Sequence, residues 1–252
     1  MKLLYFTATG NNLYLAKRLG GELYSIPQLI KEGIYEFTDE KIGLIFPIYN
    51  WSVPANVEEY LSKVTLNSDY IFAIMSYGFA HGGATHHLLE IGKKNNLTFS
   101  YINTIKMVDN YLPGFSMEAQ IKTEFKKDIE KNLDLIISDI SNDKKNLNPN
   151  SFIETWMTKG ALKVMPHQIG VGLTEKFSVE DSCTTCGICA KVCPTDNIKV
   201  NHAKPEFFNQ CCSCLACTQN CPQNAIRLKG EKSNTRFRNQ HVTLKEIINA
   251  NH

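Results

Sequence analysis

Two stretches near the C-terminal end of the chain repeat one spacing of cysteines: "CTTCGICAKVCP" at residues 183–194 and "CCSCLACTQNCP" at residues 211–222. They contain all nine cysteines of the 252-residue chain, and the first 182 residues have none. A disulfide framework spreads its cysteines so that each bridge closes a loop, and it does not normally leave an odd one. The pattern therefore indicates a different chemistry.

The two stretches are an internal duplication with an offset of 28 residues, which aligns four cysteines, a proline and an isoleucine of one run with those of the other. Three thiolates at every third residue of a tight loop can bind three corners of a cubane cluster, but the loop cannot reach the fourth corner. The run C-x2-C-x2-C-x3-C-P provides the fourth ligand by crossing over, since its last cysteine binds the cluster of the other run.

This spacing resembles that of the bacterial two-cluster ferredoxins, over roughly residues 177–230. The resemblance implies a small α+β domain with two 4Fe-4S clusters. It gives Cys212 no cluster to bind, so this residue is expected to be a packed or adventitious thiol. Zinc or purely structural thiols are the alternatives, but two complete four-cysteine runs exceed what Zn²⁺ needs. The implied ligands of one cluster are Cys183, Cys186, Cys189 and Cys221, and those of the other are Cys211, Cys214, Cys217 and Cys193.

The N-terminal part of the chain alternates apolar runs with helical patterns. Strands are expected at residues 2–6, 41–46 and 69–75 and, with more polar character, at 98–107. This alternation predicts an α/β fold with a parallel sheet and helices on both faces. Residues 118–141 are expected to form one closing helix with a core-facing stripe that consists of Ile121, Phe125, Ile129, Leu133, Ile136 and Ile140.

The loop "TATGNN", residues 7–12, follows the first expected strand and begins the first helix. Free N–H groups and the positive end of the helix dipole can hold a phosphate there. The loop has no lysine or arginine, so it is not a P-loop, and the chain has no GxGxxG fingerprint. A hydroxyl-rich helix cap is the alternative. The candidate phosphate residues are Thr7, Thr9, Gly10, Asn11 and Asn12.

The T-x-T-G-N pattern of this loop resembles the phosphate loop of flavodoxins, and the resemblance spans roughly residues 1–145, although Asn12 stands where flavodoxins often have threonine. It implies a flavodoxin-like, doubly wound, parallel five-stranded sheet that binds FMN. The flavin ring would lie beside "PIYNWSVP" (47–54) and "SYGFAHGG" (76–83). A buried aromatic is the alternative for Trp51 and Tyr77. The implied ring contacts are Pro47, Tyr49, Asn50, Trp51, Tyr77, Gly78, Gly82 and Gly83.

The stretch "DNYLPGF", residues 109–115, is expected to be a loop after the last strand. Similar sequences occur at this point in the flavodoxin-ferredoxin fusion proteins of anaerobes, which the whole chain resembles. Asn110 and Tyr111 would line the flavin cavity, or else form a structural turn anchored by Tyr111 and Pro113. The histidines His81, His86 and His87 are expected to be solvated or capping residues rather than metal ligands.

The domain organisation expected from these features has four parts. They are a flavodoxin-like FMN domain at 1–145, a partly helical linker at 146–176, a two-cluster ferredoxin domain at 177–230 and a basic, solvated tail at 231–252. Docking of an acidic redox partner is the alternative role of the tail. The net charge of +2 gives no argument for nucleic acid or an anionic membrane, and neither a signal peptide nor a long apolar run is recognised, so a cytoplasmic protein is expected.

FMN exchanges two electrons in single steps, whereas each 4Fe-4S cluster passes one electron at a time. The resemblance therefore implies an oxidoreductase-type electron carrier that exchanges electrons with redox partner proteins, and the cofactors communicate within one chain or across a homodimer. Two alternatives remain open: an FMN-dependent reductase of a small acceptor fed by the clusters, and a non-catalytic cluster protein whose flavodoxin-like domain is empty. No pair of carboxylates and no Cys-His constellation identifies a substrate, so no catalytic residue is assigned.

Overall fold

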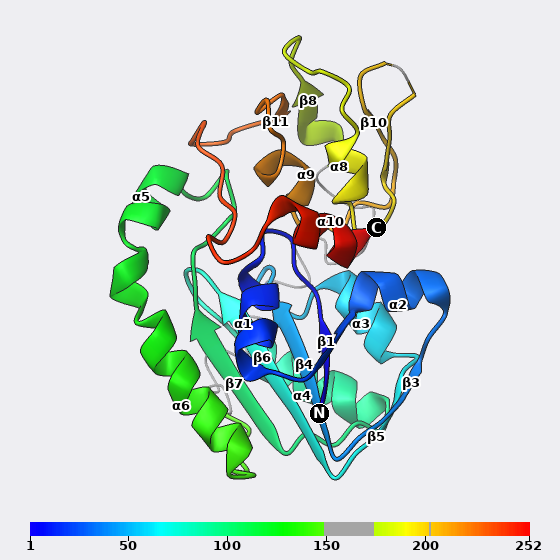
Figure 1. Ribbon diagram of the computed structural model, residues 1–252, viewed down its shortest axis with the longest axis vertical. Helices are drawn as coiled ribbons and strands as arrows, with labels where there is room; N and C mark the ends of the chain where they lie inside the picture. Colours follow the sequence, from blue (N-terminus) through cyan, green and yellow to red (C-terminus); the bar gives the residue numbers. More distant parts are fainter. Residues whose placement is uncertain (149–173, 202) are drawn as a thin grey trace.

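The computed structural model describes residues 1–148, 174–201 and 203–252. A five-stranded sheet forms the N-terminal part, and the cysteine-containing part lies over the carboxyl ends of its strands (Figure 1). The helix expected in the linker at 151–166, with Phe152, Trp156, Leu162 and Met165, lies outside the described residues. In the part of the chain that is described, no helix is long and apolar enough to cross a membrane.

The predicted parallel sheet is confirmed, and its five strands have the order β2-β1-β4-β6-β7. All neighbouring strands are parallel, so each pair needs a crossover connection. A separate parallel pair, β3 (Glu36–Thr38) and β5 (Thr65–Asn67), lies outside the main sheet. The main strands are β1 (Lys2–Tyr5), β2 (Glu22–Ser25), β4 (Lys41–Pro47), β6 (Tyr70–Tyr77) and β7 (Tyr101–Lys106).

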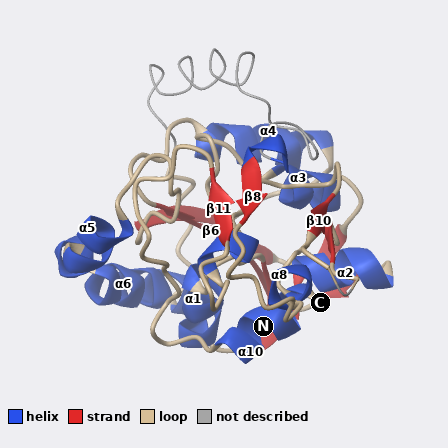
Figure 2. Cartoon of the chain, turned by 90° about the horizontal axis from the view of Figure 1, so that it is seen from above, coloured by secondary structure: helices blue, strands red, loops and turns tan. Residues whose placement is uncertain are grey.

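Helices cover both faces of the sheet. Seen from above, α1 and α6 lie on one side of it, and α3 and α4 lie on the other (Figure 2). The crossovers between the strands supply most of these helices, as parallel sheets require. The helices of the N-terminal part are α1 (Asn11–Leu19), α2 (Ile26–Glu32), α3 (Ala55–Leu61), α4 (Ala84–Lys94), α5 (Met117–Lys122) and α6 (Ile129–Ser141).

The single closing helix expected at 118–141 is wrong, because the structure divides it into α5, a short 3-10 turn and α6. The break falls at Asp128, whose φ of 50° is left-handed and cannot continue an α-helix. The predicted stripe is buried in α6, at Leu133, Ile136 and Ile140. Its N-terminal members are exposed, with Ile121 at 40% and Phe125 at 75%, since α5 and the 3-10 turn do not cover the sheet.

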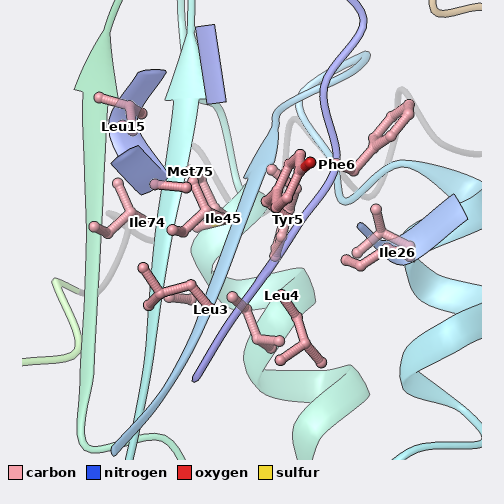
Figure 3. Close-up of a cluster of buried hydrophobic side chains, with 14 of the residues drawn as sticks. Leu3, Leu4, Tyr5, Phe6, Leu15, Ile26, Ile45, Ile74 and Met75 are labelled. Atoms are coloured by element: carbon pink, nitrogen blue, oxygen red, sulfur yellow. The ribbon is translucent and has the colours of Figure 1, made fainter. Parts of the chain in front are cut away.

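The core lies on both faces of the sheet. Consecutive residues of β1 point to opposite faces, yet Leu3, Leu4 and Tyr5 are all buried, as is Phe6 directly after the strand (Figure 3). Ile45 and Ile74 from neighbouring strands pack in the same cluster. Strands buried on both faces have continuous apolar runs, which explains why the central strands are recognisable in the sequence.

The cysteine-containing part consists of two small antiparallel pairs and two short helices. β8 (Phe177–Val179) pairs with β11 (Ile226–Leu228), and β9 (Ile198–Lys199) pairs with β10 (Glu206–Phe207). Cys189 lies in α8 (Ile188–Lys191), and Cys217, the residue at the same place in the duplication, lies in α9 (Ala216–Gln219). The duplicated sequence thus folds into duplicated local structure.

The C-terminal residues fold back onto the N-terminal part, so the expected solvated tail is wrong as a description of 231–252. The chain ends in α10 (Leu244–Asn251), which begins with a capping box formed by Thr243 and Glu246. Ile247 and Ala250 of this helix are buried, and α10 contacts α2 and α8. Arg238 and Lys245 are exposed, as a solvated basic face requires, but Arg236 is paired with Glu231 in a largely buried position.

Candidate cofactor sites

The cysteines gather around two small cavities of about 20 Å³ each. Each cavity is lined by three cysteines of one run and the fourth cysteine of the other run. The first is lined by Cys183, Cys186, Cys189 and Cys221, and the second by Cys211, Cys214, Cys217 and Cys193, with Cys212 beside them. All nine cysteines are free thiols. Among the described residues, no group of three or more His, Cys, Asp and Glu is placed to hold a single metal ion.

The backbone around the two cavities repeats as closely as the cysteines do. Left-handed conformations occur at equivalent positions of the two runs, with φ of 54° at Thr185 and 59° at Ser213, and φ of 50° at both Asp196 and Asn224. Such conformations are costly for Thr185 and Ser213, whereas Asp and Asn adopt them more readily. The two loops therefore have the same backbone shape at these positions.

Backbone N–H groups point at the cysteine sulfurs. The N–H of Asn197 donates to Cys193 Sγ at 3.3 Å, and that of Ala225, the equivalent residue, donates to Cys221 Sγ at 3.2 Å. Hydrogen bonds to ligand sulfurs stabilise the thiolate and tune the potential of an iron–sulfur cluster. The donors are therefore placed where a cluster would use them.

Burial raises the pKa of the thiols of Cys189, Cys193, Cys211 and Cys217. It raises the pKa of Cys189 to about 11 and that of Cys211 to about 12, and the neighbouring cysteines of each set add to the shift. A bound cation supplies the positive charge that favours thiolates, and a coordinating thiol is deprotonated outright. Four crowded thiols in each set, some of them buried, with N–H groups directed at sulfur, fit a 4Fe-4S cluster.

A cavity of about 470 Å³ lies at the carboxyl ends of β1, β4, β6 and β7. This volume is in the range of small-molecule and cofactor sites. Loops that follow these four strands form most of its wall. The cysteine-containing part closes it with Lys176, Ser213 and Leu215, of which the last two flank Cys214.

Most of the predicted FMN contacts line this cavity. They are Thr7, Thr9, Asn11, Asn12, Pro47, Tyr49, Asn50, Trp51, Tyr77, Gly78, Asn110 and Tyr111. Three predicted glycines do not line it. Gly82 and Gly83 lie in the turn that leads into α4, and Gly10 lies under the C-terminal residues. A Cβ on Gly10 would be 2.9 Å from Cβ of Val242, and its φ of 96° also favours glycine.

The loop 7–12 has the properties of an anion site. The first-turn N–H groups of α1 have no partners within the helix, and no acidic residue lies in that turn. Asn12 is 2% exposed and lines the cavity, and its amide nitrogen is a hydrogen-bond donor. Thr9 Oγ1 accepts from Asn110 Nδ2 at 3.1 Å, which leaves its hydroxyl proton to donate. These groups fit a phosphate.

Asp109 is a cavity residue that the sequence interpretation missed. Its Oδ1 accepts the N–H of Tyr111 at 3.0 Å, and burial raises the pKa of its carboxyl above the usual range. It packs directly on Gly78, where a Cβ would lie 2.2 Å from Cβ of Asp109. Gly78 therefore makes room for this carboxyl. Asp109 begins the stretch 109–115, and an acidic residue three positions after the end of β7 was the available signal.

Several other lining residues were also missed. Phe79 and Phe115, whose rings are 6.0 Å apart, belong to the loops 76–83 and 109–115, which were predicted to lie beside the flavin. Lys176, Ser213 and Leu215 come from the cysteine-containing part, and no local pattern could indicate that they face this cavity.

Tyr49 lies between the large cavity and the second set of cysteines. Its hydroxyl is buried and has no hydrogen-bond partner. Burial, followed by the nearby thiols of Cys214 and Cys212, raises its pKa. Asn50 and Trp51, the next two residues, are left-handed and form the tight turn closed by Tyr49 and Ser52. The turn thus follows a tyrosine that lies at the wall shared by the cavity and the cysteines.

The histidines bind protein groups near α4. His87 Nδ1 is 2.5 Å from Ser52 Oγ, and His86 pairs with Glu90 on the same helix. His81 packs edge-on against Tyr77, a residue of the cavity wall.

Comparison with known families identifies a 4Fe-4S binding domain at residues 178–199. This segment includes Cys183, Cys186, Cys189 and Cys193. No curated protein matches the chain. The chain therefore contains a ferredoxin-type iron–sulfur domain, which indicates electron transfer, joined to a five-stranded parallel sheet.

Proposed function

We propose that the chain is an electron-transfer protein that carries two 4Fe-4S clusters and one FMN and passes electrons between them. The observation that supports this most directly is the wall that the large cavity shares with the second cysteine set. Ser213 and Leu215 line the cavity, and Cys214 lies between them in the sequence. Electron tunnelling falls steeply with distance, so a cofactor in the cavity and a cluster on Cys214 would be well placed to exchange electrons.

The proposal of FMN rests on the strand order as well as on the loop 7–12. If the separate pair β3 and β5 is left aside, the main strands follow the order 2-1-3-4-5, which is the order of flavodoxin-like proteins. Proteins of this kind bind FMN outside the carboxyl ends of the strands, where the strand order reverses. The large cavity occupies that position, beside the loops after β1 and β4.

The proposal of a second cluster rests on the duplication. The second set of cysteines has the same spacing, the same left-handed positions and the same kind of N–H···S contact as the first. The proposed domains are a flavodoxin-like FMN domain at 1–145, a linker at 146–176 and a two-cluster domain at 177–230. The remaining residues, 231–252, return to the FMN domain. Exchange with redox partner proteins belongs to the proposal, and contact of the cofactors across a homodimer is the alternative to contact within one chain.

When bound, FMN supplies the conversion between two-electron and one-electron transfer. The residues of the chain bind and orient it. The first turn of α1 and Thr9 provide donors for the phosphate, and Trp51 and Tyr77 provide aromatic surface for the ring. Asp109 holds a carboxyl of raised pKa in the cavity, so it can keep a proton there at a higher pH than an ordinary aspartate.

A second candidate is an FMN-dependent reductase of a small acceptor. The cavity wall includes Phe79, which is 71% exposed, and Tyr111, which is 46% exposed, so one side of the cavity reaches solvent. A small molecule could enter there, beside the carboxyl of Asp109. Steady turnover of such an acceptor would favour this candidate over an electron carrier.

The composition of the purified protein tests the proposal. Protein prepared without oxygen should contain about eight iron ions and eight acid-labile sulfides per chain, because each cysteine set holds one complete cluster. It should also release one flavin that is identified as FMN. The measurement is an absorbance spectrum together with counts of iron, sulfide and flavin. Four irons per chain would contradict the second cluster, and a protein that neither contains nor takes up FMN would contradict the flavin site.

A further inference from the structure

Helix α9 and the residue after it connect two cysteines that belong to different sets. Cys217, inside α9, lines the second cysteine cavity, and Cys221 lines the first. Gln219 and Asn220 lie between these two cysteines. This segment is thus attached to one cysteine cavity at each end.

The side chains of Gln219 and Asn220 reach the wall of the large cavity. Gln219 Nε2 donates to the carbonyl of Asn110 at 2.7 Å, and Asn220 Nδ2 donates to the carbonyl of Ala8 at 3.1 Å. Ala8 belongs to the phosphate loop, and both acceptor residues line the cavity. Two of the loops that form the cavity are therefore held from the segment between the cysteines.

These contacts are protected from water. Gln219 and Asn220 are each 3% exposed. Gln219 Oε1 also accepts the N–H of Phe237 at 2.8 Å, and Asn220 Nδ2 also donates to the carbonyl of Ala216 at 3.0 Å. A buried carbonyl that loses its donor is left unsatisfied, which costs more than an exposed hydrogen bond is worth. The positions of these amides therefore matter for the shape of the cavity.

α9 cannot hold these amides in place alone. It has four residues, and isolated helices much longer than this are marginal in water. Ligation of Cys217 and Cys221 by two clusters would fix both ends of the segment. Without the clusters, the thiols at each end are unligated, and only packing and the hydrogen bonds of the two amides hold the segment against the loops.

Two other asparagines hold the phosphate loop without lying between cysteines. Asn251 Nδ2 donates to the carbonyl of Thr7 at 3.2 Å, and the backbone N–H of Asn239 donates to the carbonyl of Thr9 at 2.8 Å. The carbonyls of Thr7, Ala8 and Thr9 thus each accept from the C-terminal part of the chain. Asn251 is fully buried, as Asn220 nearly is, which makes it a matched control for a contact with the loop that is independent of the clusters.

We propose that Gln219 and Asn220 couple cluster assembly to flavin affinity, so that the chain binds FMN more tightly when its clusters are in place. This inference rests on the proposed function. Coupling between two bound groups is reciprocal, so bound FMN must stabilise the clusters by the same factor. The two amides act as positioning residues, because they hold the loops that line the cavity.

The test uses the full chain, loaded with clusters under anaerobic conditions, and measures the rate at which a ferrous-iron chelator removes iron. Saturating FMN is expected to slow this loss about tenfold in the wild type, since two buried hydrogen bonds are at stake. In Asn220→Ala the protection should fall to about threefold, because the hydrogen bond from Gln219 remains. Asn251→Ala should bind FMN more weakly but keep the protection once FMN is saturating. Gln219→Met, which keeps the length of the side chain, should behave like Asn220→Ala.

A second measurement is the dissociation constant of FMN, by quenching of flavin fluorescence, in cluster-loaded and cluster-depleted wild type. FMN is expected to bind about tenfold more weakly after the clusters are removed. Equal affinity in the two forms, or protection that is unchanged in both Asn220→Ala and Gln219→Met, would overturn it and leave the proposed function standing. If the cluster-loaded wild type binds no FMN at all, the proposed function fails and the coupling fails with it.

Discussion

Asn12→Asp is expected to abolish the binding of FMN but not that of riboflavin. The substitution changes an amide to a carboxylate of the same size, at a cavity position in the first turn of α1. Like charges about 4 Å apart near a protein surface repel by about 4 kcal/mol, which corresponds to about a thousandfold in dissociation constant. Riboflavin has the same ring and no phosphate, so its affinity should change by less than about fivefold.

Folding and cluster content should survive this substitution. A negative charge in the first turn of a helix is favourable by about 0.3–1 kcal/mol, so the carboxylate replaces the charge that the phosphate would supply. Asn67→Asp is the matched control, because it makes the same change at an exposed residue of β5. Titration of each variant with FMN and with riboflavin, alongside an iron count, provides the measurement. An equal loss of affinity for both flavins would show that the phosphate does not bind at this loop.

Cys193→Ser is expected to remove the cluster of the second run rather than that of its own run. Cys193 lines the cavity formed by Cys211, Cys214 and Cys217. Serine is a poor ligand for iron, so about four of the eight irons should be lost. The electron paramagnetic resonance spectrum of the reduced variant should lose the signal that interacts with the flavin and retain the other.

Two variants control this experiment. Cys221→Ser should remove the other cluster, because Cys221 lines the cavity of Cys183, Cys186 and Cys189. Cys212→Ser should keep all the iron, since the second set has four ligands without it. If Cys193→Ser instead removes the cluster bound by Cys183, Cys186 and Cys189, the crossover assignment is wrong.

The features that the sequence predicts well are those with local physical signatures. The central strands of the sheet are buried on both faces, so they have uninterrupted apolar runs such as residues 41–46 and 69–75. Strand β2 lies at the edge, where Glu22 and Leu23 are exposed, and its sequence has no such run. The spacing of the cysteines is likewise a local signature, since three ligands of a cluster come from one tight loop.

The features that the sequence does not predict depend on contacts between distant segments. Asn251 and Thr7 are 244 positions apart, and no composition or periodicity indicates that they are bonded. The same holds for Gly10, which is required by the approach of Val242. Left-handed residues such as Asp128, which divides the expected long helix, give no periodic signal either. The wall between the large cavity and Cys214 belongs to this group, and it is the part of the structure on which the proposed function depends most.

The proposed function requires that the flavin and the clusters exchange electrons inside one chain. Rapid mixing of the anaerobic, fully loaded protein with a one-electron donor tests it most directly, by following the cluster and flavin absorbance separately. We expect the clusters to be reduced first and the flavin phase to have the same rate constant at every protein concentration, because Ser213 and Leu215 bring the second cysteine set to the wall of the large cavity. A flavin phase that slows in proportion to dilution would contradict exchange within one chain, since electrons would then pass between the two halves only when separate molecules collide.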